Sequence, residues 1–160
     1  MPSIVREDLQ SDREIVIERL IAAPRHVVWK AWAEPGNIEQ WWGPDGFTTT
    51  THQRDFRSGG IWRFTMHGPD GRDYENRIDY LEVVENERIV DDHGGEGETA
   101  HIRFRAEITF EDHDGGTLVT MRSVFPTVEM RDLVIREHGA VEGGKQTLAR
   151  LAAMAEKLAA

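Results

Sequence analysis

Two side chains, His138 and Tyr80, are the best candidates for acid–base chemistry in this sequence. His138 follows Met130 and Val134 at intervals of four residues, so it falls on the apolar side of a predicted C-terminal helix. A histidine that faces a cavity could hydrogen-bond a ligand or transfer a proton, because its pKa lies near neutrality. The ordinary alternative is a histidine that bonds a nearby carbonyl or carboxylate, or that faces solvent. We therefore assign no catalytic residue and keep these two as candidates.

The residue types and their spacing give little support for a metal site or for a catalytic nucleophile. His52, His67 and His101 fall on different predicted strands, and no helical His-x-x-x-His spacing brings metal ligands together. The chain has no cysteine and no Gly-x-Ser-x-Gly sequence, so the usual thiol and serine nucleophiles are missing. We predict no metal site and no nucleophile.

The glycine-rich segment 93–98 has the composition of a loop but not of a phosphate-binding loop. It is acidic and does not lead into a helix, whereas phosphate-binding loops present backbone amides at a helix N-terminus. We expect no nucleotide and no other cofactor. A flexible loop at the mouth of a pocket is the alternative use of this segment.

The tandem pair Trp41-Trp42 belongs to a larger set of apolar side chains that could line a ligand cavity. Ligand pockets are mostly apolar with a few polar groups. Regularly spaced apolar residues also fill ordinary cores, so a filled interior is the alternative. The predicted ligand-binding residues are Trp41, Trp42, Trp62, Phe64, Met66, Tyr80, Met121, Phe125, Val134, His138 and Val141.

Composition limits the classes of partner. The chain has 160 residues and a formal net charge of −10, which disfavours nucleic acid because phosphate backbones bind basic surfaces. Its apolar stretches are too short to span a membrane, and the absence of cysteine favours a reducing cytoplasm. We expect a polar, flexible N-terminal arm over residues 1–12 and a single domain over residues 13–160.

The elements that position these residues follow from the periodicity of the sequence. A first strand is predicted over 13–21, and the prolines at 24 and 35 each begin a short helix. Further strands are predicted over 48–56, 62–67, 74–84, 88–91, 100–111 and 117–125. A long helix follows, with Thr127 as its N-cap and a kink or close approach expected at Gly139, Gly143 and Gly144.

This order predicts an α+β fold. A curved antiparallel sheet of about seven strands needs a cover for its apolar face, and the C-terminal helix is the only element long enough to provide it. The gap between sheet and helix is then either filled by side chains or left open.

Several successive motifs resemble a known family. They are the segment 23–32, which reads APRHVVWKAW, followed by Trp41-Trp42-Gly43-Pro44-Asp45-Gly46-Phe47, Asp55-Phe56-Arg57-Ser58-Gly59-Gly60 and Gly115-Gly116-Thr117. The chain is similar to bacterial domains related to the activator of the heat-shock-protein-90 ATPase, within the START-like (SRPBCC) superfamily. The resemblance implies a helix-grip fold with a hydrophobic cavity between sheet and helix. Many relatives carry tryptophan where this chain has Gly144, which implies more space beside the helix.

Relatives in this superfamily bind lipids, hormones and polyketides, and some catalyse cyclisation or dehydration. We expect this chain to bind a hydrophobic or amphipathic small molecule without transforming it. The alternatives are a cyclase or dehydratase acting in the same cavity, and a chaperone-associated or protein-interaction module. A homodimer is an open alternative to a monomer.

Overall fold

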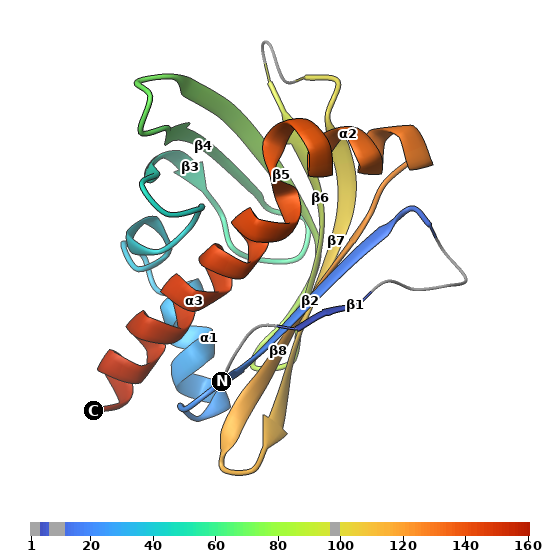
Figure 1. Ribbon diagram of the computed structural model, residues 1–160. Coiled ribbons are helices and arrows are strands. Elements are labelled where there is room, and N and C mark those ends of the chain that lie inside the picture. Colours follow the sequence, from blue (N-terminus) through green and yellow to red (C-terminus); the bar gives the residue numbers. More distant parts are fainter. Residues whose placement is uncertain (1–3, 7–11, 97–99) are drawn as a thin grey trace.

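A single antiparallel sheet dominates the computed structural model, which describes residues 4–6, 12–96 and 100–160 (Figure 1). The eight strands follow the order β1-β2-β8-β7-β6-β5-β4-β3 across the sheet. Their bounds are β1 Ile4–Arg6, β2 Glu14–Ile21, β3 Thr48–Arg54, β4 Ile61–His67, β5 Asp73–Val84, β6 Arg88–Gly95, β7 Arg103–His113 and β8 Gly116–Val124. Strands β3 to β8 form a meander, and β2 joins its end by pairing with β8.

The helices lie on one face of this sheet. They are α1 Arg25–Ala33, the 3-10 helix η1 Ile38–Gln40, α2 Val128–His138 and α3 Ala140–Ala159. In Figure 1, α3 crosses in front of the sheet, with α2 at its upper end and α1 beside its C-terminal half. The predicted α+β helix-grip architecture is therefore confirmed. Of the two short helices, the second is a single 3-10 turn. No helix in the described ranges has the length and apolarity needed to cross a membrane.

The C-terminal helical segment is broken at Gly139, so the one long helix predicted there is two helices. Thr127 caps α2 as predicted, because its side chain accepts a hydrogen bond from the backbone N–H of Met130 at 3.1 Å. Gly139 then adopts the left-handed conformation with φ of 58° and ψ of 39°, which glycine tolerates best. The break lets α2 turn away from the axis of α3 above the end of the sheet (Figure 1).

Two segments differ from their sequence-based expectations. Within the expected N-terminal arm, Ile4–Arg6 forms β1 and pairs with β2, while residues 1–3 and 7–11 lie outside the described residues. Within the expected glycine-rich loop, His93, Gly94 and Gly95 continue β6, because they pair with Ile78, Arg77 and Asn76 of β5. Residues 97–99 lie outside the described residues.

The strand register decides which side chains face the helices. Tyr80, Asp91 and Ala106 are direct neighbours on β5, β6 and β7, and the row continues through Ser123 to Ile15. Because strand side chains alternate between the two faces, Ile89 and His93 share the inner face with Asp91. Most of this inner face is apolar, which makes the carboxyl group in its centre unusual.

An aromatic cluster fills one end of the space between sheet and helices. The ring centroids of Trp32 and Trp41 lie 4.8 Å apart, and those of Trp42 and Trp62 lie 5.2 Å apart. The Trp41 indole N–H donates to the carbonyl of Ala31 at 2.9 Å, so its polar atom is satisfied within the core. This end of the interior is a packed core.

Candidate functional site

A cavity of about 450 Å³ lies between the inner face of the sheet and the junction of α2 with α3. Ile17, Met121 and Phe104 form part of its floor, and Val134 and Thr147 come from the two helices. The loop after η1 supplies a side wall, which includes Trp42, Gly43, Pro44 and Phe47. The cavity therefore opens beside the aromatic core, where the broken helix leaves the floor of the sheet uncovered.

The loop wall is fixed to α3 by one side chain. The Arg150 guanidinium donates from Nη1 to the carbonyls of Gly43 at 2.9 Å and Pro44 at 3.1 Å. Its Nη2 donates to the carbonyl of Gln40 at 3.3 Å. The planar fork of arginine suits such multiple acceptors, so Arg150 ties the turn that carries Trp42 to the long helix.

The structure brings together about half of the predicted ligand-binding residues at this cavity. The six residues that line it are Trp42, Met66, Met121, Phe125, Val134 and His138. Trp41, Trp62, Phe64 and Tyr80 do not line it, because their rings are buried in the core next to it. Val141 is half-buried against the core and also does not line the cavity.

The two candidates for acid–base chemistry occupy contrasting positions. Tyr80 is buried, and burial raises the pKa of its phenol to about 12. Its hydroxyl accepts a hydrogen bond from Nε of Arg54 at 3.5 Å. His138 is exposed at the rim of the cavity, at the end of α2. Neither side chain is therefore enclosed in the cavity.

The histidines considered as metal ligands bond to separate partners. His52 contacts the hydroxyl of Thr65 at 2.6 Å, and His67 contacts the carboxylate of Asp73 at 2.7 Å. His101 is exposed in the segment before β7. Across the described ranges, no three histidine, aspartate or glutamate side chains gather as a metal site.

Sequence reasoning missed Asp91, the most unusual polar group at the cavity. Asp91 lines the cavity, yet its side chain is only 4% exposed. Its Oδ1 atom is buried and has no hydrogen-bond partner among the described residues. Burial, helped by the negative charge of Asp92, raises the pKa of the Asp91 carboxyl to about 8. The sequence did contain a signal for this position. Side chains alternate between the two faces of a strand, so Asp91 lies on the same inner face as the apolar Ile89 two residues before it.

His93 is the second missed residue, two positions along the same strand. It is half-buried at the cavity, and burial lowers the pKa of its imidazole to about 4. Its Nε2 lies 3.1 Å from Oδ1 of Asn76, whose amide nitrogen donates to the carbonyl of Tyr74 at 3.0 Å. Because that amide is oriented by Tyr74, Nε2 of His93 carries the proton and Nδ1 is an acceptor.

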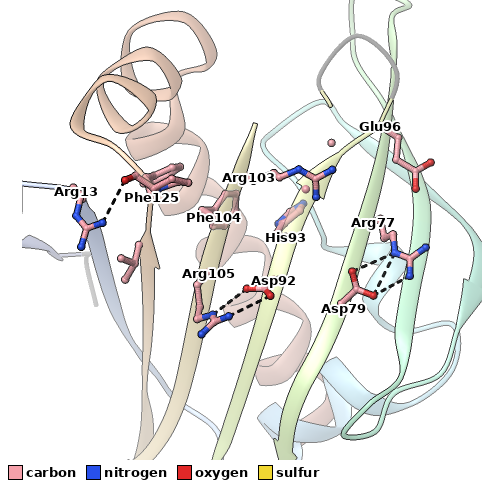
Figure 2. Close-up of a pocket in the computed structure, with 14 residues that line it drawn as sticks. Arg13, Arg77, Asp79, Asp92, His93, Glu96, Arg103, Phe104, Arg105 and Phe125 are labelled. Atoms are coloured by element: carbon pink, nitrogen blue, oxygen red, sulfur yellow. Dashed lines mark hydrogen bonds and ion pairs between the residues drawn. The ribbon is translucent and has the colours of Figure 1, made fainter. Parts of the chain in front are cut away.

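A second hollow of about 530 Å³ lies on the outer face of the sheet and shares His93, Gly95, Phe104 and Phe125 with the inner cavity (Figure 2). Its polar walls include two ion pairs. Arg77 bonds Asp79 at 3.0 Å, and Arg105 bonds Asp92 at 2.9 Å. These charges are exposed and already neutralise one another, so the inner cavity is the better candidate for a ligand site.

Comparisons with known proteins agree with this fold. The family model described as "Activator of Hsp90 ATPase homolog 1-like protein" matches residues 22–156. The solved structure of protein Ms6760 from Mycobacterium smegmatis is 28% identical, with a TM-score of 0.85 and 96% of each chain covered.

Two further solved structures share the fold. A protein from Arthrobacter aurescens is 23% identical, with a TM-score of 0.86 over 96% of this chain and 91% of its own. Protein NE0264 from Nitrosomonas europaea is 23% identical, with a TM-score of 0.81 over 94% of this chain and 97% of its own. No curated protein matches the sequence. Because the family model covers most of the chain, this protein belongs to the family of activator of Hsp90 ATPase homologue 1-like proteins.

Proposed function

We propose that this protein binds a hydrophobic or amphipathic small molecule in the cavity beneath the α2–α3 junction, without changing it chemically. The observation that carries the proposal is a largely apolar cavity of about 450 Å³ beside a fully packed aromatic core. Small-molecule sites commonly have volumes of about 300–1,000 Å³ and a few convergent polar groups. Asp91, His93 and Asn76 are such groups here.

The alternative functions have weaker support. A cyclase or dehydratase that used Tyr80 or His138 would need these groups inside the cavity, but Tyr80 does not line it and His138 is exposed. A protein-interaction module would present an exposed apolar patch. Among the described residues the large exposed apolar side chains are Leu81 and Leu158, on β5 and at the end of α3.

The proposal is tested by filling the cavity. Ala106 is a buried residue of its floor, so Ala106→Phe would occupy the space where a ligand binds. The probe is N-phenyl-1-naphthylamine, an uncharged dye that fluoresces in apolar sites. We expect saturable binding to the wild-type protein and at least about tenfold weaker binding to the variant, a loss of roughly 1.4 kcal/mol.

Two further variants make this test specific. Thr109→Leu adds a similar apolar group to the same strand but on the outer face, so its dye binding should match that of the wild type. Ser123→Leu fills the cavity from β8, so the test can still be made if Ala106→Phe does not fold. Dye binding that is absent from the wild type, or that survives both filling substitutions in folded protein, would overturn the proposal.

A further inference from the structure

Among the described residues, Asp91 has no counter-charge within the cavity that it lines. The titratable side chains at the cavity are Asp91, His93, Tyr74, Glu137 and His138, and none of the lining residues is lysine or arginine. His93 is uncharged near neutral pH, because burial holds its pKa near 4. Glu137 is exposed on α2 and adds a second carboxyl group to the rim. The site therefore carries acidic groups without the cations that would balance them.

In the part of the chain that the structure describes, the elements packed around Asp91 do not supply a partner either. Its cross-strand neighbours are Tyr80 and Ala106. The nearest arginine to Tyr80, Arg54, donates from Nη2 to the carbonyl of Trp32 at 2.8 Å, and its guanidinium stacks over the ring of Phe56 at 4.6 Å. The adjacent carboxyl, Asp92, points to the outer face and pairs with Arg105. The Oδ1 atom of Asp91 consequently stays without a hydrogen bond among the described residues.

An unpaired buried carboxyl group is costly, so its presence calls for an explanation. A buried polar atom without a partner destabilises a protein, because it has lost its hydrogen bonds to water without gaining others. Replacing Asp91 with an apolar residue would remove that cost without altering the strand. A ligand that completes the bonding of Asp91 accounts for a carboxyl group at this place.

The charge pattern selects among amphipathic ligands. A ligand carboxylate or phosphate would be buried at a site where the described lining residues include no lysine or arginine to stabilise its charge, so fatty acids and phospholipid head groups are disfavoured. A protonated amine would pair with Asp91 and donate to its free oxygen atom. The aromatic rings of Trp42, Tyr74 and Phe104 also line the cavity, and such rings attract cations and pack against an apolar body.

We propose, on the basis of the proposed function, that the ligand is an amphipathic amine whose ammonium group pairs with the carboxylate of Asp91 while its apolar body occupies the cavity. Because Asp91 is protonated below about pH 8 in the empty protein, the ligand binds as the ammonium ion and the carboxyl proton leaves to solvent. Binding is thus linked to the release of one proton.

The test compares three molecules with one apolar body and different heads: 4-phenylbutylamine, 4-phenylbutanol and 4-phenylbutyrate. Each competes with the fluorescent dye for the full-length protein. At pH 8 we expect the amine to bind at least about tenfold more tightly than the alcohol, and the carboxylate to bind most weakly. Between pH 6 and pH 8 the advantage of the amine should grow by up to about tenfold per pH unit, following ionisation of Asp91.

Two variants assign this preference to one carboxyl group. In Asp91→Asn the amine and alcohol should bind within about threefold of each other, and the pH dependence of amine binding should disappear. Asp92→Asn is the matched control, because Asp92 is the next residue and faces the outer surface. It should keep the amine preference. Binding of the alcohol to Asp91→Asn shows that the variant retains its cavity.

The outcomes separate this inference from the function on which it rests. Equal binding of amine and alcohol by the wild type, or an amine preference that survives Asp91→Asn, overturns the amine assignment and leaves the binding function standing. Failure of all three molecules and of the dye to bind overturns the proposed function itself. The affinities of the three molecules for the wild-type protein at different pH values test the inference even if a variant fails to fold.

Discussion

Asp91 and His93 occupy consecutive inward positions of β6, and burial moves their pKa values in opposite directions, to about 8 and to about 4. Both groups are therefore uncharged near neutral pH. With their unperturbed pKa values, 3.8 for Asp91 and 6.5 for His93, Asp91 would be fully charged there and His93 partly charged. Two uncharged polar side chains can occupy an apolar floor at a lower cost than two charged ones. Their shifts make stability depend on pH.

The first prediction concerns that dependence. Between pH 3.8 and 8 the folded protein keeps a proton on Asp91 that the unfolded chain releases, so the contribution of Asp91 to stability falls as pH rises. Between pH 4 and 6.5 the unfolded chain binds a proton at His93 that the folded protein does not, so the contribution of His93 falls as pH decreases. The two slopes oppose each other up to about pH 6.5, and only that of Asp91 acts above it.

Asp91→Asn isolates the first slope. The free energy of unfolding of the variant minus that of the wild type should rise with pH, by at most about 1.4 kcal/mol per unit, and level off above about pH 8. Urea unfolding measured from pH 4.5 to 9 checks this, and subtraction removes the titration of all other groups. A difference that is constant across this range would show that Asp91 is not buried as a neutral acid.

The second prediction concerns Arg150, which links the loop wall to α3 through the carbonyls of Gly43 and Pro44. Arg150→Lys keeps the positive charge but cannot reach several carbonyls with a planar fork. We expect the variant to lose about 1–2 kcal/mol of unfolding free energy, since one or more charged hydrogen bonds are broken. Dye affinity should also fall, because the turn that carries Trp42 is less firmly held.

Urea unfolding and dye titration measure these two effects. The matched control is Arg136→Lys, an exposed arginine on α2, which should change neither quantity appreciably. If Arg150→Lys is destabilised but binds the dye with wild-type affinity, then ligand binding does not depend on how firmly Arg150 holds the loop wall.

The third prediction concerns the break between α2 and α3. A Cβ atom at Gly139 would touch nothing within 4 Å, so Gly139→Ala probes the left-handed backbone alone. We expect a loss of about 1–2 kcal/mol, as for other non-glycine residues held at positive φ. Gly139→Asn should recover part of that loss, because asparagine tolerates this conformation better. Thermal and urea unfolding of both variants provide the measurement, and equal stability of all three proteins would contradict it.

The periodicity of the sequence was sufficient to predict the strands β2 to β8, because alternation between apolar and polar residues reports directly on a sheet with two different faces. It did not predict β1, which lies within the expected N-terminal arm. It failed at the C-terminal end of β6. Gly94 and Gly95 read as a loop, yet they extend the strand because β5 is long enough to pair with them. The predicted strand ended at Asp91, so the prediction did not place His93 on the inner face. Asp91 and His93 were therefore not recognised as polar residues of the same site.

The position of the cavity could not be predicted from the same pattern. Trp62 and Phe64 share the inner face of β4 with Met66, but only Met66 lines the cavity. The rings of Trp62 and Phe64 stack at 3.8 Å and belong to the packed end of the interior. Alternation identifies a face, whereas an open space along that face depends on where the helices approach it. Residues far apart in the sequence decide that distance.

The fourth prediction concerns Gly144, where α3 packs against Ile17 of β2. A Cβ atom at Gly144 would lie 2.3 Å from Cδ1 of Ile17, so a side chain cannot enter without moving that methyl group. Ile17 therefore occupies the place that a side chain at position 144 would take. Gly144→Ala gains helix propensity worth about 1 kcal/mol but must displace Ile17 within the floor of the cavity.

A double-mutant cycle separates these opposing effects. Ile17→Val removes Cδ1 and should cost about 0.5–1.5 kcal/mol by itself. In the Ile17→Val background Gly144→Ala should be more favourable than in the wild type by about 1 kcal/mol or more, because the clash is absent and the helix propensity remains. Additive free energies of unfolding would mean that Ile17 moves aside without cost, and that the helix does not depend on this glycine to approach the sheet.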